Sequence, residues 1–99
     1  MANLKDQQQS SIARVAERAR RELVEITGLQ PEGVTSLERY DDGKWKVIVE
    51  LLEFPRIPET DDVLGTYEAS VTPNGELLGY HRIRRYPRGS AVQDPGHLR

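Results

Sequence analysis

The sequence contains no cysteine, and its 99 residues include only one phenylalanine, one tryptophan and two histidines. Without cysteine, the fold can hold neither a disulfide nor a thiolate metal site, and it has no cysteine nucleophile. No run of 18 apolar residues occurs, and the N-terminal residues lack the apolar stretch of a signal peptide. We therefore expect a cytoplasmic protein that does not insert into a membrane.

Side chains suited to catalysis are scarce. Histidine is the commonest general base near neutral pH, but His97 falls in the C-terminal tail and His81 in the last predicted strand. The chain has no Gly-rich phosphate loop, no nucleophile-elbow motif and no metalloprotease motif. A domain of this size also has a thin core with little room for a deep pocket. We expect no catalytic residue and no cofactor, and we interpret the chain as an accessory or assembly factor.

The one acidic cluster that could attract a hard cation consists of Glu59, Asp61 and Asp62. Calcium needs six to eight oxygen ligands, usually from an ordered loop with a glycine at its sharp turn. This cluster has neither the spacing nor the glycine. We expect a surface loop or the cap of a strand here, and no metal site.

Charge is distributed unevenly along the chain. Residues 31–77 hold eleven acidic and four basic side chains, whereas residues 78–99 hold five basic and one acidic. Such polarity can steer a partner towards the surface, or it can be compensated within the fold. The sequence leaves both interpretations open.

The predicted domain begins with the periodicity of an amphipathic helix over residues 9–27. A frayed segment at 1–8 precedes it. Its apolar stripe comprises Ile12, Val15, Ala16, Ala19, Leu23 and Ile26. Gly28 suits the position after a helix end, and Pro31 prevents the helix from resuming.

After Pro31 the period changes to two, which predicts strands at 34–40, 44–53, 63–72 and 77–86. Turn signals at 41–43 and 73–75 join neighbouring strands in antiparallel pairs. The prediction is an α+β domain over residues 9–86, in which one helix packs on the Trp45 face of a four-stranded meander (α-β-β-β-β). Residues 87–99 read as a disordered tail. Ile48 and Leu52 leave the outer sheet face partly apolar, so this face could support oligomerisation.

The last predicted strand is the most basic part of the chain. Period two places Tyr80, Arg82, Arg84 and Tyr86 on one face and His81, Ile83 and Arg85 on the other. Arginine interleaved with tyrosine suits a protein-binding patch or a nucleic-acid surface. The charges could also protect an edge strand from aggregation. Nucleic acid is the weaker option, because the net charge of the chain is −2.

The segment 54–58 is the second candidate binding element. Pro55 and Pro58 stiffen a connection that carries an aromatic, a basic and an aliphatic side chain, and low conformational entropy favours binding. Alternatively, the apolar side chains cover the end of the core. The two candidate surfaces together comprise Phe54, Arg56, Ile57, Tyr80, Arg82, Arg84, Arg85 and Tyr86.

An ordered set of motifs carries a family resemblance across residues 12–88. They include LVEITG at 23–28, DDGKW at 41–45, RIPETDDVL at 56–64 and YHRIRRY at 80–86. With them the chain resembles the gas vesicle synthesis protein GvpO family, although it lacks the extended acidic N-terminal region expected of longer members. The resemblance implies a cytoplasmic accessory protein, associated with gas vesicles, that contacts other gas vesicle proteins in assembly or its regulation. It supplies no catalytic residues.

Overall fold

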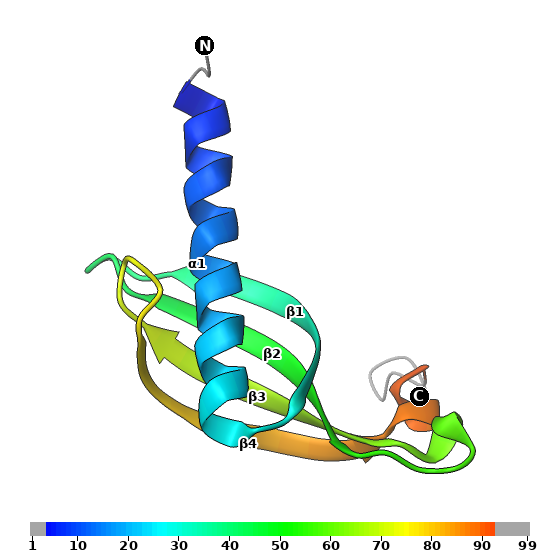
Figure 1. Ribbon diagram of the computed structural model, residues 1–99. Coiled ribbons are helices and arrows are strands. Elements are labelled where there is room, and N and C mark those ends of the chain that lie inside the picture. Colours follow the sequence, from blue (N-terminus) through cyan, green and yellow to red (C-terminus); the bar gives the residue numbers. More distant parts are fainter. Residues whose placement is uncertain (1–3, 93–99) are drawn as a thin grey trace, which may run out of the picture.

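The computed structural model describes residues 4–92 and consists of one long helix on one face of a four-stranded sheet (Figure 1). The elements are α1 (Leu4–Thr27), β1 (Gln30–Arg39), β2 (Trp45–Phe54), the 3-10 turn η1 (Glu59–Asp61), β3 (Val63–Val71), β4 (Leu77–Pro87) and the 3-10 turn η2 (Arg88–Val92). All three strand pairs are antiparallel, in the order β1-β2-β3-β4. The predicted α+β meander is confirmed.

The two ends of the chain differ from expectation where they are described. Helix α1 begins at Leu4, so residues 4–8 are helical. At the other end, β4 runs to Pro87 and residues 88–92 form η2. The remainder of the expected frayed segment, residues 1–3, and of the expected tail, residues 93–99, lies outside the described residues.

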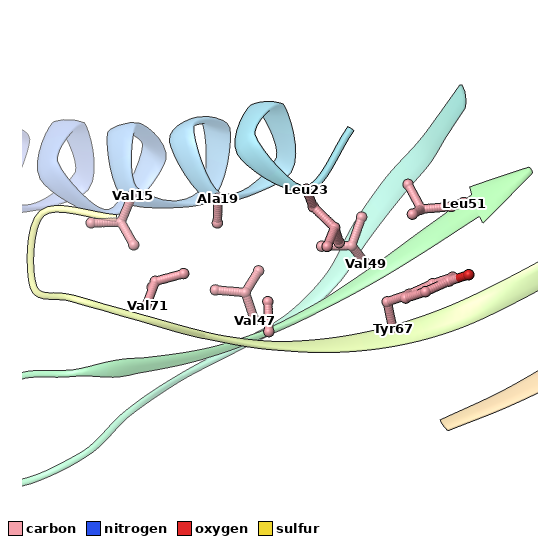
Figure 2. Close-up of a cluster of buried hydrophobic side chains, with 9 residues drawn as sticks. Val15, Ala19, Leu23, Val47, Val49, Leu51, Tyr67 and Val71 are labelled. Atoms are coloured by element: carbon pink, nitrogen blue, oxygen red, sulfur yellow. The ribbon is translucent and has the colours of Figure 1, made fainter. Parts of the chain in front are cut away.

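The core is one layer of side chains between α1 and the sheet (Figure 2). Val15, Ala19 and Leu23 are buried at successive turns of the helix. They pack on the helix-facing side chains of β2 and β3, which are Val47, Val49, Leu51, Tyr67, Ala69 and Val71. The predicted stripe is wrong at its ends, where Ile12 and Ile26 are 43% and 60% exposed. These residues lie on either side of the contact, because a straight helix crosses a twisted sheet over only part of its length.

Local signals account for the ends of the helix and strands. The hydroxyl of Thr27 donates to the Leu23 carbonyl, and Gly28 follows with a φ of 73°. Gly43 and Gly75 also have positive φ, in the two predicted turns. Strand β1 begins at Gln30, four residues earlier than predicted. It tolerates Pro31 because it lies at the edge of the sheet.

Replacing Leu23 by alanine tests how much the contact between α1 and the sheet contributes to stability. Leu23 is fully buried, so the substitution should lower the free energy of unfolding by about 2–5 kcal/mol. Ile26→Ala is the matched control on the same helix and should change it by less than about 0.5 kcal/mol, because Ile26 is exposed. Urea unfolding of both variants measures the difference, and equal losses would contradict this packing.

Candidate interaction surface

A β-bulge divides the basic strand β4 between the two faces of the sheet. Arg82 lies opposite Tyr67 and Arg84 lies opposite Thr66, so Ile83 is an extra residue in β4. Beyond a bulge the alternation of side chains reverses. The predicted grouping of Tyr80, Arg82, Arg84 and Tyr86 on one face is therefore wrong.

Arg82 and Arg85 meet on the helix side of the sheet, beyond the end of the core. Both contact the carboxylate of Glu53, whose side chain is only 4% exposed. The nearest contacts of this carboxylate are Arg85 Nε and the Tyr67 hydroxyl, each donating at 2.7 Å. Gly65 leaves the room for it, because a Cβ there would collide with the Glu53 carboxylate. Sequence reasoning missed Glu53, since a glutamate at a strand end looks like a solvated residue.

Burial of the Glu53 carboxylate by itself raises its pKa, but hydrogen bonds from Tyr67 and Arg85 outweigh this effect and lower the pKa overall. Glu53 thus remains charged and orients both partners. Arg82 and Arg85 stay 42% and 47% exposed, so part of each guanidinium group can still reach a ligand.

The β2–β3 connection extends this surface with apolar groups. The centroid of the Phe54 ring lies 5.8 Å from the guanidinium carbon of Arg56 and 5.5 Å from that of Arg85. Phe54 is 47% exposed and Ile57 is 99% exposed, before a cis bond to Pro58. The expectation that these two residues only cover the core is therefore not met by Ile57. We call Phe54, Arg56, Ile57, Arg82 and Arg85 the proline tip.

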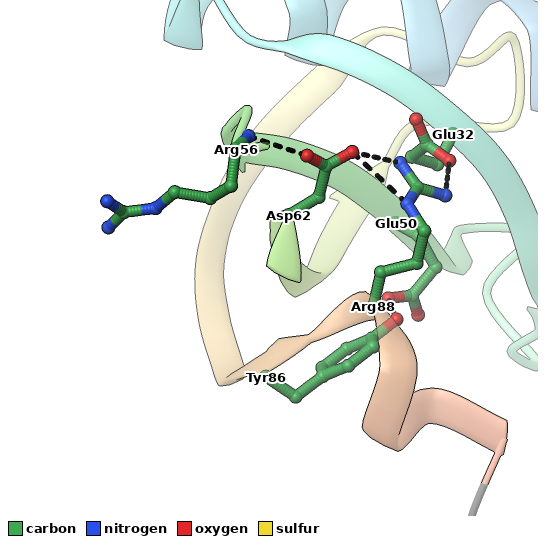
Figure 3. Close-up of polar contacts among 6 residues, drawn as sticks. All are labelled: Glu32, Glu50, Arg56, Asp62, Tyr86 and Arg88. Atoms are coloured by element: carbon green, nitrogen blue, oxygen red, sulfur yellow. Dashed lines mark hydrogen bonds and ion pairs between the residues drawn. The ribbon is translucent and has the colours of Figure 1, made fainter. Parts of the chain in front are cut away.

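An ion-pair network fixes the proline tip to the rest of the sheet (Figure 3). Buried Asp62 accepts a hydrogen bond from the Arg56 backbone N–H at 2.7 Å, while the Arg56 guanidinium points away from the network. The other oxygen of Asp62 binds Arg88 at 3.1 Å, and Arg88 also binds Glu32 at 2.9 Å. These hydrogen bonds raise the pKa of Arg88. Asp62 thus fixes the backbone directly before β3, which agrees with the expected cap of a strand.

Of the described residues, none belong to a group of three or more side chains placed to hold a metal ion. In the same part of the chain, no helix is long and apolar enough to cross a membrane. His81 is exposed, 4.0 Å from Glu68.

Arg84 and Tyr86 lie on the outer face, apart from the proline tip. The Tyr86 hydroxyl donates to Glu50 at 2.6 Å, and the Thr66 hydroxyl donates to the same oxygen at 2.8 Å. Arg84 donates to Thr66 and stacks over the Tyr86 ring at 4.7 Å. Tyr80 stays on the helix side, with its ring 6.2 Å from that of Tyr67. The structure thus brings together five of the eight predicted residues.

Glu53→Gln should destabilise the fold by about 1.5–3 kcal/mol, because it weakens charge-assisted hydrogen bonds in a buried site. The native pKa of Glu53 is lowered, so the advantage of the wild type is present above the unfolded pKa of about 4.5 and disappears as pH falls through the native pKa. Unfolding curves at several pH values test this. The exposed Glu25→Gln is the control, and a pH-independent difference for Glu53→Gln would contradict the assignment.

Tyr86→Phe should lower stability below pH 10, and its difference from the wild type should shrink in alkali. Burial and the hydrogen bond to Glu50 raise the pKa of Tyr86 from 10.0 to about 12. The protonated hydroxyl therefore stabilises the fold fully below pH 10, and this contribution, at most about 2–3 kcal/mol, is lost between pH 10 and about 12. Denaturant unfolding should show a smaller alkaline loss for the variant than for the wild type. Parallel pH profiles would refute this role.

The family model described as gas vesicle synthesis protein GvpO matches residues 1–92. Gas vesicle protein O of Streptomyces sp. (strain CB03234) is 46% identical over 83 residues, covering 84% of this chain and 64% of the relative. Gas vesicle protein O1 of Halobacterium salinarum is 34% identical over 77 residues, covering 78% and 64%.

Gas vesicle protein O of Haloferax mediterranei is 32% identical over 77 residues, covering 78% of this chain and 55% of the relative. The chain thus spans less than two thirds of the length of these relatives. No solved structure matches it. The match of the family model over nearly the whole chain shows that this protein belongs to the gas vesicle synthesis protein GvpO family.

Proposed function

We propose that the chain is a non-catalytic accessory protein of gas vesicle formation that binds another gas vesicle protein through the proline tip. The observation that carries this proposal is the position of Ile57, whose side chain is 99% exposed on a connection that Asp62 fastens to the fold. Membership of the GvpO family supports a role in gas vesicle formation. The exposed side chains of the proline tip support binding to another protein. Localisation in the cytoplasm, with association to gas vesicles, belongs to the same proposal.

The proline tip has the composition of a protein-binding surface. Aromatic and arginine side chains are enriched at interfaces, and the exposed Phe54 ring is flanked by Arg56 and Arg85. Two prolines and the hydrogen bond from the Arg56 backbone to Asp62 restrict the segment before binding, which reduces the entropy lost on association. A partner of matching chemistry would offer an apolar pocket with acidic residues at its rim.

A nucleic-acid-binding regulator is the alternative, and the arrangement of β4 supports it less. The bulge at Ile83 separates Arg82 from Arg84, so the strand presents no continuous basic face. Arg85 and Arg88 are neutralised by carboxylates, and the Tyr86 hydroxyl is bound to Glu50. Fewer unpaired cations mean fewer phosphate contacts.

Oligomerisation through the outer sheet face also remains a proposal. Ile48 and Leu52 are half-buried on this face, where Lys46 pairs with Glu38 and Glu50 accepts a hydrogen bond from Tyr86. Phe54 and Ile57 at the proline tip are more exposed, at 47% and 99%.

The double substitution Phe54→Ala/Ile57→Ser should abolish capture of the partner when the chain is purified from cells that express the gas vesicle cluster, and vesicle formation should fall. Both side chains are exposed, so the unfolding midpoint should stay near that of the wild type. Ile83→Ser removes a half-exposed isoleucine from the edge strand β4 and is the matched control.

Unchanged capture by the double variant would overturn the proposed surface. Capture that is lost equally in the Ile83→Ser control would show that the proline tip has no special role. Salt-sensitive binding of the purified protein to an oligonucleotide would favour the nucleic-acid alternative instead.

A further inference from the structure

A second surface lies at the end of the sheet opposite the proline tip. There the β3–β4 turn lies beside α1, whereas the β2–β3 connection is at the far end (Figure 1). Between the helix and the turn is a groove of about 440 Å³. Its lining residues are Ala13, Arg14, Glu17, Arg18, Arg21 and Asn74. We call it the arginine groove.

The β3–β4 turn, which forms one wall of the arginine groove, lies close against α1 and has a fixed shape. Gly75 has a φ of 95°, and a Cβ there would lie 3.1 Å from Arg18 Cβ and 3.2 Å from the Val15 carbonyl oxygen. The turn can therefore approach the helix closely only with glycine at this position. The Thr72 hydroxyl accepts hydrogen bonds from the backbone N–H groups of Asn74 and Glu76, which hold the turn in one shape.

The charges of the groove are only partly compensated. Arg18 binds Glu22 at 2.8 Å, and Glu17 binds Arg20 at 2.6 Å. Arg14 and Arg21 form no ion pair with any residue from 11 to 90, the range whose side chains the structure describes. The groove is thus lined by the ion-paired Arg18 and by two guanidinium groups that have no ion-pair partner within that range.

We propose that the arginine groove binds an acidic segment of a partner protein, with one carboxylate on Arg14 and a second on Arg21. The two positions are seven residues apart on α1, about 10 Å along the helix axis. A peptide in the polyproline II conformation covers about 9 Å in three residues, and side chains three residues apart project from the same side of it. The matching sequence has two acidic residues separated by two others, and the guanidinium fork can hold each carboxylate with two hydrogen bonds.

The lining favours a peptide over a nucleic acid. The groove contains no aromatic ring on which a base could stack, and Glu17 with the neighbouring Glu22 and Glu76 would repel a continuous run of phosphates. Asn74 offers both a donor and an acceptor, which suits a peptide backbone. The inference is independent of the proposed function, because it uses none of the residues of the proline tip.

A nuclear magnetic resonance titration of the isotope-labelled full chain tests the proposal. The ligand is the blocked peptide Ala-Glu-Ala-Ala-Glu-Ala, and the same peptide with glutamine in place of glutamate is its control. We expect the acidic peptide alone to shift the backbone amide signals around Arg14, Arg21 and Asn74. Arg14→Ser/Arg21→Ser should weaken binding at least about tenfold, as expected for loss of two charge-assisted contacts.

Lys46→Ser/Arg84→Ser removes the same charge from the outer face of the sheet and should keep the affinity of the wild type. Lys46 pairs with Glu38 and Arg84 donates to Thr66, both on the face of the sheet that does not carry α1. No binding of the acidic peptide, equal binding by Arg14→Ser/Arg21→Ser, or shifts confined to the proline tip would each overturn the proposal. So would tighter binding of oligothymidylate to the same amides, which would identify the ligand as a nucleic acid.

Discussion

The contact of α1 with β2 and β3 determines how the rest of the molecule is built. Ala19 is fully buried at its centre, and a side chain this small lets the helix lie close to the sheet. The helix covers only part of the sheet face on which it packs. The sheet beyond Leu51 therefore has no apolar layer above it. There the sheet is covered by Glu53 and by the side chains that donate to it, Tyr67, Arg82 and Arg85, and not by apolar side chains. The proline tip begins where the core ends.

Features that depend on local sequence were predictable. The helix, the four strands and both glycine turns follow from periodicity and turn chemistry, and strands joined by short turns can only form a meander. The apolar stripe was predictable at Val15, Ala19 and Leu23 but not at Ile12 and Ile26, because its outer limits depend on the extent of the sheet beneath the helix.

Features that depend on distant residues were not predictable. Nothing in Arg82-Ile83-Arg84-Arg85 signals a bulge, since the run has no apolar alternation to fix its register. The side-chain partners of Glu53 and Asp62 lie 14 to 32 residues away. Such pairs appear only when the strands are aligned. The grouping of Tyr80, Arg82, Arg84 and Tyr86 rested on a periodicity that the bulge breaks.

The Asp62–Arg88–Glu32 network has a consequence for synthesis of the chain. Arg88 and Glu32 are separated by 56 positions, and Arg88 follows the last strand. A nascent chain grows from its N-terminus, so the helix, the first three strands and the proline tip all leave the ribosome before Arg88 does. Until then Pro55 and Pro58 restrict the β2–β3 connection, but the ion pairs that hold it to β1 have not formed. The proposed binding surface is thus completed last, after translation has passed the end of the sheet.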